Sequence, residues 1–151
     1  MTQEEEKNLL LKDLCTRLPY GVRYRHFTWN DEYGETYIAA QIYSINTDGY
    51  VKNCHDDETV YIDNVRPYLF PLSSMTEEQK RELNKKFNVQ FSGNDIHSIH
   101  YYSEGCWDTD LELDLQDWLW FINWCYKNHF DVNKLIEKGL AIDATGLNIY
   151  C

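Results

Sequence analysis

The sequence contains one row of alternating carboxylates whose spacing suits recognition of a charged partner. Residues 108–115 read Asp-Thr-Asp-Leu-Glu-Leu-Asp-Leu, which predicts a strand with one acidic face, made of Asp108, Asp110, Glu112 and Asp114. Alternate residues on a strand stand about 6.8 Å apart, and carboxylates at that spacing can imitate nucleic-acid phosphates or meet a basic groove on another protein. The structural alternative is a solvated face of an edge strand, where charged side chains discourage aggregation.

Two tryptophans close to this row form a second candidate contact surface. The expected core face of the helix predicted over residues 115–128 is an apolar stripe made of Trp118, Phe121, Ile122, Cys125 and Tyr126. Trp120 and Trp124 are four residues apart and fall on the opposite, more polar side. Burying an indole is worth a few kcal/mol, so we expect both rings to be covered. The cover is either the protein's own tail, or a partner protein or second copy of the chain, because tryptophan dominates binding hot spots.

A further set of residues could bind an anionic small molecule. The set combines arginines and tyrosines in and near the predicted strands: Tyr20, Arg23, Arg25, Arg66 and Tyr68. Guanidinium groups bind phosphates through paired hydrogen bonds and pack on aromatic rings, so a nucleotide is the ligand class that this composition indicates. The alternative is that these residues form ordinary surface pairs on the strands.

Metal-binding and nucleophilic patterns are weak in this sequence. His97 and His100 are three residues apart in a segment that reads as strand or loop, where their rings would point apart. Cys106 and the adjacent Cys54 and His55 complete no tetrahedral set. The chain has no P-loop and no Gly-x-Ser-x-Gly nucleophile motif. We therefore expect no cofactor, no metal and no catalytic residues, and an unrecognised enzyme is the third of three interpretations.

The composition restricts the partners. With 14 basic and 25 acidic residues among 151, the chain carries a formal net charge of −11. That charge argues against direct binding of nucleic acid or an anionic membrane, and it attracts a partner protein with a basic surface. Five cysteines without a CxxC pair indicate reduced thiols. The acidic N-terminus and the shortness of every apolar run add to the expectation of a cytoplasmic protein.

Apolar periodicity and turn signals predict a single α+β domain over residues 1–151. We expect an N-terminal helix, an antiparallel β-sheet and a C-terminal aromatic helix packed on it. The helices are expected at residues 2–18, 76–86 and 115–128, and the strands at residues 22–29, 36–45, 50–51, 59–62, 87–91 and 96–102. A capping box at Thr2 marks the first helix, and Pro67 and Pro71 require an extended crossing segment.

Three stretches of the chain carry a resemblance: residues 9–22 (LLLKDLCTRLPYGV), 65–79 (VRPYLFPLSSMTEEQ) and 129–142 (HFDVNKLIEKGLAI). They resemble a family of small uncharacterised proteins that is common in gut Bacteroidales and in their phages and mobile elements. The resemblance implies a cytoplasmic protein of a bacterial host cell, and it transfers no activity and no site residue. A phage setting favours a role in modulating the host, which is an inference by association.

These observations order three functional hypotheses. The first is a non-enzymatic interaction protein, for example a phage or mobile-element inhibitor of a host protein, that binds a basic partner through its acidic aromatic surface or forms a homo-oligomer. The alternative is a protein that binds or sequesters a small ligand such as a nucleotide signal. The third is an enzyme whose site the sequence does not reveal.

Overall fold

The chain begins with a helix whose first turn has the predicted cap. The computed structural model describes residues 1–32, 34–56, 58–92, 95–101 and 115–150. Helix α1 (Gln3–Arg17) starts where the Thr2 side chain accepts a hydrogen bond from the backbone N–H of Glu5, and the Glu5 carboxylate accepts one from the backbone N–H of Thr2. This reciprocal pairing satisfies two backbone donors that the helix itself leaves unpaired. The helix passes into the short 3-10 turn η1 (Leu18–Tyr20), and Gly21 follows with a φ of 71°, a conformation that favours glycine.

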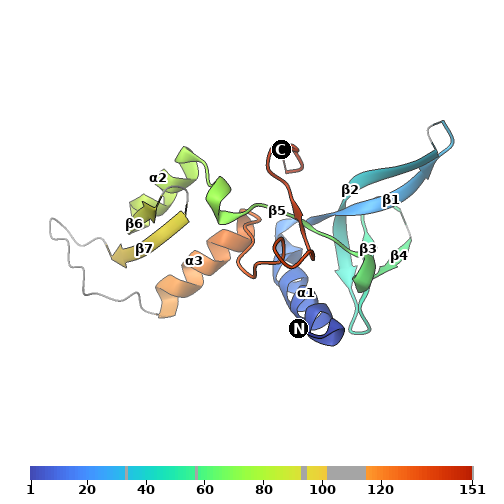
Figure 1. The fold of residues 1–151 in the computed structure, drawn as a ribbon, viewed down its shortest axis with the longest axis horizontal. Helices are drawn as coiled ribbons and strands as arrows, with labels where there is room; N and C mark the ends of the chain where they lie inside the picture. The colour runs from blue at the N-terminus through green and yellow to red at the C-terminus, as the bar shows by residue number, and fades with distance from the viewer. Residues whose placement is uncertain (33, 57, 93–94, 102–114, 151) are drawn as a thin grey trace.

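A curled antiparallel sheet follows the first helix (Figure 1). Its strands, in spatial order, are β1 (Arg23–Asn30), β2 (Gly34–Ile45), β3 (Tyr50–Asn53) and β4 (Thr59–Tyr61). After the turn η2 (Ile62–Asn64) the chain returns to the free edge of β1, where the backbone N–H of Arg25 donates to the carbonyl of Arg66 at 3.1 Å. Tyr24 and Pro67 form an isolated antiparallel bridge beside it. The segment after β4 therefore runs alongside the first strand of the same sheet.

The second half of the chain is built from shorter elements. They are β5 (Tyr68–Leu69), η3 (Leu72–Ser74), α2 (Glu77–Lys86), β6 (Phe87–Ser92), β7 (Asp95–Tyr101), α3 (Leu115–Lys127) and β8 (Ile142–Asp143). Strands β6 and β7 pair as a hairpin, and β5 pairs in parallel with β8. In Figure 1, α2, β6, β7 and α3 lie at one end of the molecule, α1 and the curled sheet lie at the other, and β5 and β8 lie between them.

Two hydrophobic clusters match these two ends. The first packs α1 against the concave side of the sheet, with Leu10, Leu14, Val22, Tyr24, Ile42, Val51 and Leu69 among its buried members. The second gathers around α3 and consists of Met75, Leu83, Phe121, Trp124, Cys125 and Phe130. The predicted α+β class, with an N-terminal helix, an antiparallel sheet and a C-terminal aromatic helix, is confirmed. The buried face of α3 meets α2 and the chain around Phe130, since none of the described residues of the curled sheet belongs to this cluster.

A buried ion pair connects the two ends. Arg17, near the end of α1, donates from Nε to Asp13 Oδ2 at 2.6 Å and from Nη2 to Asp13 Oδ1 at 3.1 Å, and both side chains are 0% exposed. The Arg17 Nη2 also donates to the carbonyl of Phe130 at 2.6 Å, and the guanidinium lies over the ring of Tyr126. Asn133 donates to Asp13 Oδ1 at 2.8 Å. One arginine therefore holds both the last turns of α3 and the loop after it against α1.

Replacing Arg17 should destabilise the whole fold. In Arg17→Met the charge of Asp13 stays buried without its partner, so we expect the free energy of unfolding to fall by about 3–5 kcal/mol in chemical denaturation. The matched control is Lys12→Met, at an exposed position of the same helix, which should cost less than about 1 kcal/mol. The double variant Asp13→Asn/Arg17→Met should lose less than the single variant. Equal losses in Arg17→Met and Lys12→Met would contradict this role.

Candidate functional site

A buried histidine joins β1 to the chain before β4. His26, on β1, directs its Nε2 at the segment that precedes β4, where Asp56 Oδ2 lies 2.9 Å away and Glu58 Oε2 lies 3.8 Å away. The His26 side chain is 2% exposed, whereas those of Asp56 and Glu58 are 29% and 70% exposed. We call these three residues the clasp, because they connect the first strand of the sheet to the approach to its last.

Hydrogen bonds behind the clasp determine which nitrogen of His26 carries its hydrogen. The Asp56 carboxylate can only accept, so Nε2 carries the hydrogen that it donates. The Nδ1 lies 3.1 Å from Tyr24 Oη, and Asn53 Nδ2 donates to the same oxygen at 3.0 Å, so the phenol hydrogen of Tyr24 is directed to Nδ1. Asn53 Oδ1 in turn accepts the backbone N–H groups of His55 and Asp56. The buried polar atoms of this group therefore support one another.

The same hydrogen bonds set the charge of the clasp. Burial opposes ionisation of Asp56, but the hydrogen bonds from His26, from the backbone N–H of Glu58 and from Asn53 outweigh it and lower the pKa of Asp56. Burial raises the pKa of Tyr24, while the hydrogen bond from Asn53 acts in the opposite direction. At neutral pH the clasp thus holds an ionised Asp56 beside a neutral phenol.

A surface pocket of about 240 Å³ opens beside the clasp. The residues that line it include Arg25, His26, Phe27, Tyr37, Glu58 and Arg66, and we call it the arginine–aromatic pocket. The Arg25 guanidinium lies 4.9 Å from the centroid of the Tyr37 ring, and Phe27 meets the same ring edge to face, with centroids 5.7 Å apart. The pocket thus combines two cationic groups with two aromatic rings at the place where β1, β2 and the chain after β4 meet.

The structure brings together two of the five residues of the predicted anion-binding set. Arg25 and Arg66 line the arginine–aromatic pocket. Arg23 instead donates from Nη1 to the carbonyl of Ala39, and its backbone N–H donates to Tyr150 Oη. Tyr68 is buried on β5, which raises the pKa of its phenol, although the charge of Arg25 acts against this. Arg23 and Tyr68 are not among the residues that line this pocket, and Tyr20 lines a separate hollow beside Trp120.

The expected tryptophan surface on α3 is also wrong. Trp124 is only 5% exposed and stacks between Phe121 and Phe130 within its own chain, and Trp120 packs partly buried against the same cluster with Lys86 over its ring. Trp118 is instead 46% exposed, although the helical wheel placed it on the core face. The helix is apolar on most sides, so its pattern alone did not indicate which sector would meet the core. Trp124 is consequently not available to a partner.

Exposed aromatic side chains occur on the first hairpin instead. Trp29 is 66% exposed and Tyr37 is 59% exposed, and Phe27 is paired with Tyr37 across β1 and β2. Near the end of this hairpin, Asp31, Glu32 and Glu35 are exposed as well, and Glu35 is the cross-strand partner of Trp29. An aromatic surface bordered by acidic groups therefore exists on the first hairpin.

The other predicted groups contribute no site within the described residues. The acidic row of Asp108, Asp110, Glu112 and Asp114 lies outside the residues that the structure describes, as does Cys106, and no side chain is described for His97 or His100. Cys54 and His55 are exposed near the clasp without entering it. Burial raises the pKa of the Cys125 thiol to about 12, although the charge of Arg17 acts against this, so the thiol stays protonated.

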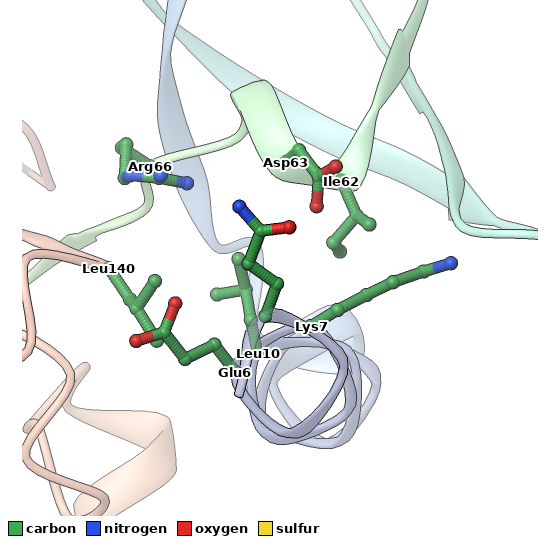
Figure 2. A pocket seen from close by; sticks show the side chains of 8 residues that line it. Glu6, Lys7, Leu10, Ile62, Asp63, Arg66 and Leu140 are labelled. Atoms are coloured by element: carbon green, nitrogen blue, oxygen red, sulfur yellow. The ribbon is translucent and has the colours of Figure 1, made fainter. Parts of the chain in front are cut away.

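A second hollow lies between α1 and the turn η2 and has a different charge pattern. Its volume is about 220 Å³. Figure 2 shows Glu6, Lys7 and Leu10 coming from α1, with Ile62, Asp63 and Arg66 on the opposite side. Arg66 thus borders both hollows, but here the carboxylates of Glu6 and Asp63 are beside it. An anion would be repelled by two carboxylates in this hollow and by only that of Glu58 in the arginine–aromatic pocket, so the latter is the better anion site.

A third hollow, of about 360 Å³, surrounds a buried histidine after α3. His129 adopts a φ of 63°, and its ring stacks on Tyr150 with centroids 3.6 Å apart and planes 10° apart. Burial, together with the positive charges of Arg17 and Arg23, lowers the pKa of His129 to about 4. The imidazole is therefore neutral near neutral pH and serves as a packing element between the loop after α3 and the C-terminal tail.

Sequence reasoning missed the clasp entirely. His26 lies 30 residues from Asp56, and neither belongs to a motif with regular spacing. One signal was present: His26 occupies the inward-facing register of a predicted strand, where a polar side chain requires a partner. The partner's position depended on the curl of the sheet, which the sequence pattern does not specify.

Comparisons with known proteins add no family assignment: no family model, curated protein or solved structure matches this chain. Among the helices that the structure describes, none is long and apolar enough to cross a membrane. The function must therefore be argued from the site itself.

Acid should destabilise the protein through His129. The unfolded chain binds a proton at His129 below about pH 6.5, whereas the folded protein binds it only near pH 4, so stability is lost as the pH falls through this window. We expect the free energy of unfolding, measured by urea denaturation, to drop by about 2 kcal/mol between pH 7 and pH 5 from this group. In His129→Asn, which tolerates the positive φ, that drop should disappear. An unchanged pH dependence in this variant would contradict the assignment.

Proposed function

We propose that this protein is a non-catalytic binding protein whose arginine–aromatic pocket takes a small anionic ligand with an aromatic ring, of the nucleotide class. The observation that carries the proposal is the convergence of Arg25 and Arg66 on one pocket that also presents the rings of Phe27 and Tyr37. Arg25 lies on β1 and Arg66 on the segment that returns to the edge of β1 after η2, so only folding brings them together. Guanidinium groups bind phosphate and stack on aromatic rings, so two arginines beside two aromatic rings suit a phosphate attached to a flat ring.

The dimensions of the pocket favour a ligand of mononucleotide size. Pockets for drug-sized ligands usually enclose about 300–1,000 Å³, and this one measures about 240 Å³. The Arg25 guanidinium already lies over the Tyr37 ring, and a base could add to this stack while the phosphate meets Arg66. The rest of the ligand would remain in solvent, which is compatible with a protein that sequesters or senses a small signal.

Neutralising either pocket arginine should weaken ligand binding. A hydrogen bond to a charged group contributes about 1.5–3 kcal/mol, so we expect Arg25→Gln and Arg66→Gln each to raise the dissociation constant for AMP or cyclic AMP by about tenfold or more. The measurement is isothermal titration calorimetry, supported by thermal shift. Inorganic phosphate and adenosine, tested separately, report the contributions of the anion and the ring.

The matched control for this test is Arg81→Gln, which removes an exposed arginine of α2 far from the pocket lining. It should bind like the unaltered protein. If none of the nucleotides binds, or if Arg81→Gln weakens binding as much as the pocket variants do, the pocket is not a nucleotide site.

The exposed hairpin supports a second candidate function, in which the protein binds a partner protein with a basic surface. The observation that favours it is the exposure of Trp29 at 66% among the acidic residues Asp31, Glu32 and Glu35. Exposed tryptophan is typical of binding hot spots, and the acidic border, within a chain of net charge −11, complements a basic surface. In a phage or mobile element such a partner would be a host factor.

Crosslinking at position 29 tests this second function. A photo-reactive phenylalanine analogue that replaces Trp29 should yield one dominant adduct in cells, identified by mass spectrometry as a protein with a basic surface. The charge reversals Asp31→Lys and Glu35→Lys should reduce its yield severalfold, because they remove the complementary charge. The same analogue at Tyr43, equally exposed on β2, is the control. Equal adducts at positions 29 and 43, or an adduct with a second copy of this chain, would contradict a basic partner.

A further inference from the structure

We propose that the clasp of His26, Asp56 and Glu58 is a binding site for a divalent transition-metal ion of the zinc class. One nitrogen of an imidazole and oxygens of two carboxylates can each offer one ligand atom here, and these atoms all lie within 4.8 Å of one another. This goes beyond the proposed ligand binding, because the ion needs only the protein's own side chains.

The distances in the clasp fit a small metal ion with little rearrangement. Zinc binds nitrogen and oxygen ligands at about 2.0–2.2 Å, which places neighbouring ligand atoms of a tetrahedron about 3.3 Å apart. The His26 Nε2 lies 2.9 Å from Asp56 Oδ2 and 3.8 Å from Glu58 Oε2, so the two separations lie on either side of that value. Glu58 is 70% exposed, so its side chain can move the short remaining distance.

The hydrogen bonds behind His26 already hold the ring as a metal ligand requires. Metal-binding histidines usually have their other ring nitrogen held by a hydrogen bond, which orients the ring. Here Tyr24 Oη holds Nδ1 at 3.1 Å and leaves Nε2 directed at the two carboxylates. When the ion replaces the hydrogen on Nε2, that hydrogen moves to Nδ1 and is donated to Tyr24. The phenol hydrogen then loses its present acceptor, a cost that is small beside three metal–ligand bonds.

The charge of the clasp also favours a cation. Two carboxylates face the Nε2 of His26, and among the described residues no hydrogen bond is donated to the Glu58 carboxylate. Nitrogen with carboxylate oxygen is the ligand set of zinc and related transition metals, whereas magnesium and calcium prefer oxygen alone. Three protein ligands leave a fourth position open, and both His26 and Glu58 line the arginine–aromatic pocket into which it would face.

This open position links the ion to the ligand, a step that rests on the proposed function. Without a cation, the carboxylate of Glu58 would repel a phosphate in the same pocket. With the ion bound, that charge is compensated and the ion can accept a phosphate oxygen as its fourth ligand. The ion and an anionic ligand should therefore strengthen each other's binding.

Titration with Co²⁺ and Zn²⁺, in the absence of any nucleotide, tests the site directly. We expect one ion per chain by calorimetry, a visible absorption band typical of four- or five-coordinate Co²⁺, and displacement of that band by Zn²⁺. The NMR signal of the His26 side chain should shift as Nε2 loses its hydrogen. Absence of both the band and the shift would overturn the proposal.

Two conservative variants separate a metal site from a merely structural clasp. Glu58→Gln alters an exposed side chain and should keep the unfolding temperature of the unaltered protein in EDTA. Asp56→Asn keeps one oxygen for the His26 hydrogen bond but places an amide NH2 where Asn53 and the backbone N–H of Glu58 donate, so it should fold with a lower unfolding temperature. Each should weaken Co²⁺ binding by about tenfold or more. Glu137→Gln, at an exposed position outside the clasp, is the matched control and should bind Co²⁺ normally. Equal Co²⁺ affinity in all three variants would overturn the assignment.

A final measurement keeps the two proposals distinguishable. AMP titrations with and without Co²⁺ should show at least about fivefold tighter binding when the ion is present, and this gain should vanish in Glu58→Gln. Co²⁺ binding without any AMP binding would refute the ligand and leave the metal site standing. AMP binding without Co²⁺ binding would refute the metal site and leave the ligand pocket standing.

Discussion

The buried pairing of Asp13 with Arg17 is the constraint on which the arrangement of the molecule depends. A guanidinium and a carboxylate that are both 0% exposed are tolerable only when they meet each other and other polar groups. Arg17 satisfies this requirement with Asp13 and the carbonyl of Phe130. Phe130 also packs beneath Trp124, so the arginine that ends α1 determines where α3 and its cluster sit. The two hydrophobic clusters are thereby joined through a directional contact, whereas apolar packing alone would leave their relative placement loose.

A second buried polar side chain, His26, constrains the curled sheet in the same way. Pairing with β3 alone would not bring β4 close to β1. The buried His26 on β1, however, requires a hydrogen-bond partner for each of its ring nitrogens. Tyr24 and Asp56 supply those partners, and Asp56 brings the chain before β4 to β1. The same closure places Arg66 near Arg25 and forms the arginine–aromatic pocket. The candidate ligand site and the candidate metal site thus both result from one structural requirement.

Local features of the fold were predictable because they depend on neighbouring residues. The capping box at Thr2 and the long first hairpin follow from side-chain chemistry and alternation, and the structure has both. The orientation of α3 was not predictable, because apolar residues occupy most of its surface. Burial of Trp124 depends on the return of Phe130 beneath it. Likewise, two of the three predicted arginines, Arg25 and Arg66, line one pocket, while contacts with Ala39 and Tyr150 hold Arg23 elsewhere.

By itself, the sequence determined the α+β class, the start of the first helix and the negative charge that limits the choice of partners, because each of these depends on composition or on residues a few positions apart. Only the tertiary structure decided which side chains form a site. His26 and Asp56 are 30 residues apart, and Asp13 and Asn133 are 120 apart. Such pairs form because buried polar groups need hydrogen-bond partners, and only the complete fold brings these distant residues together.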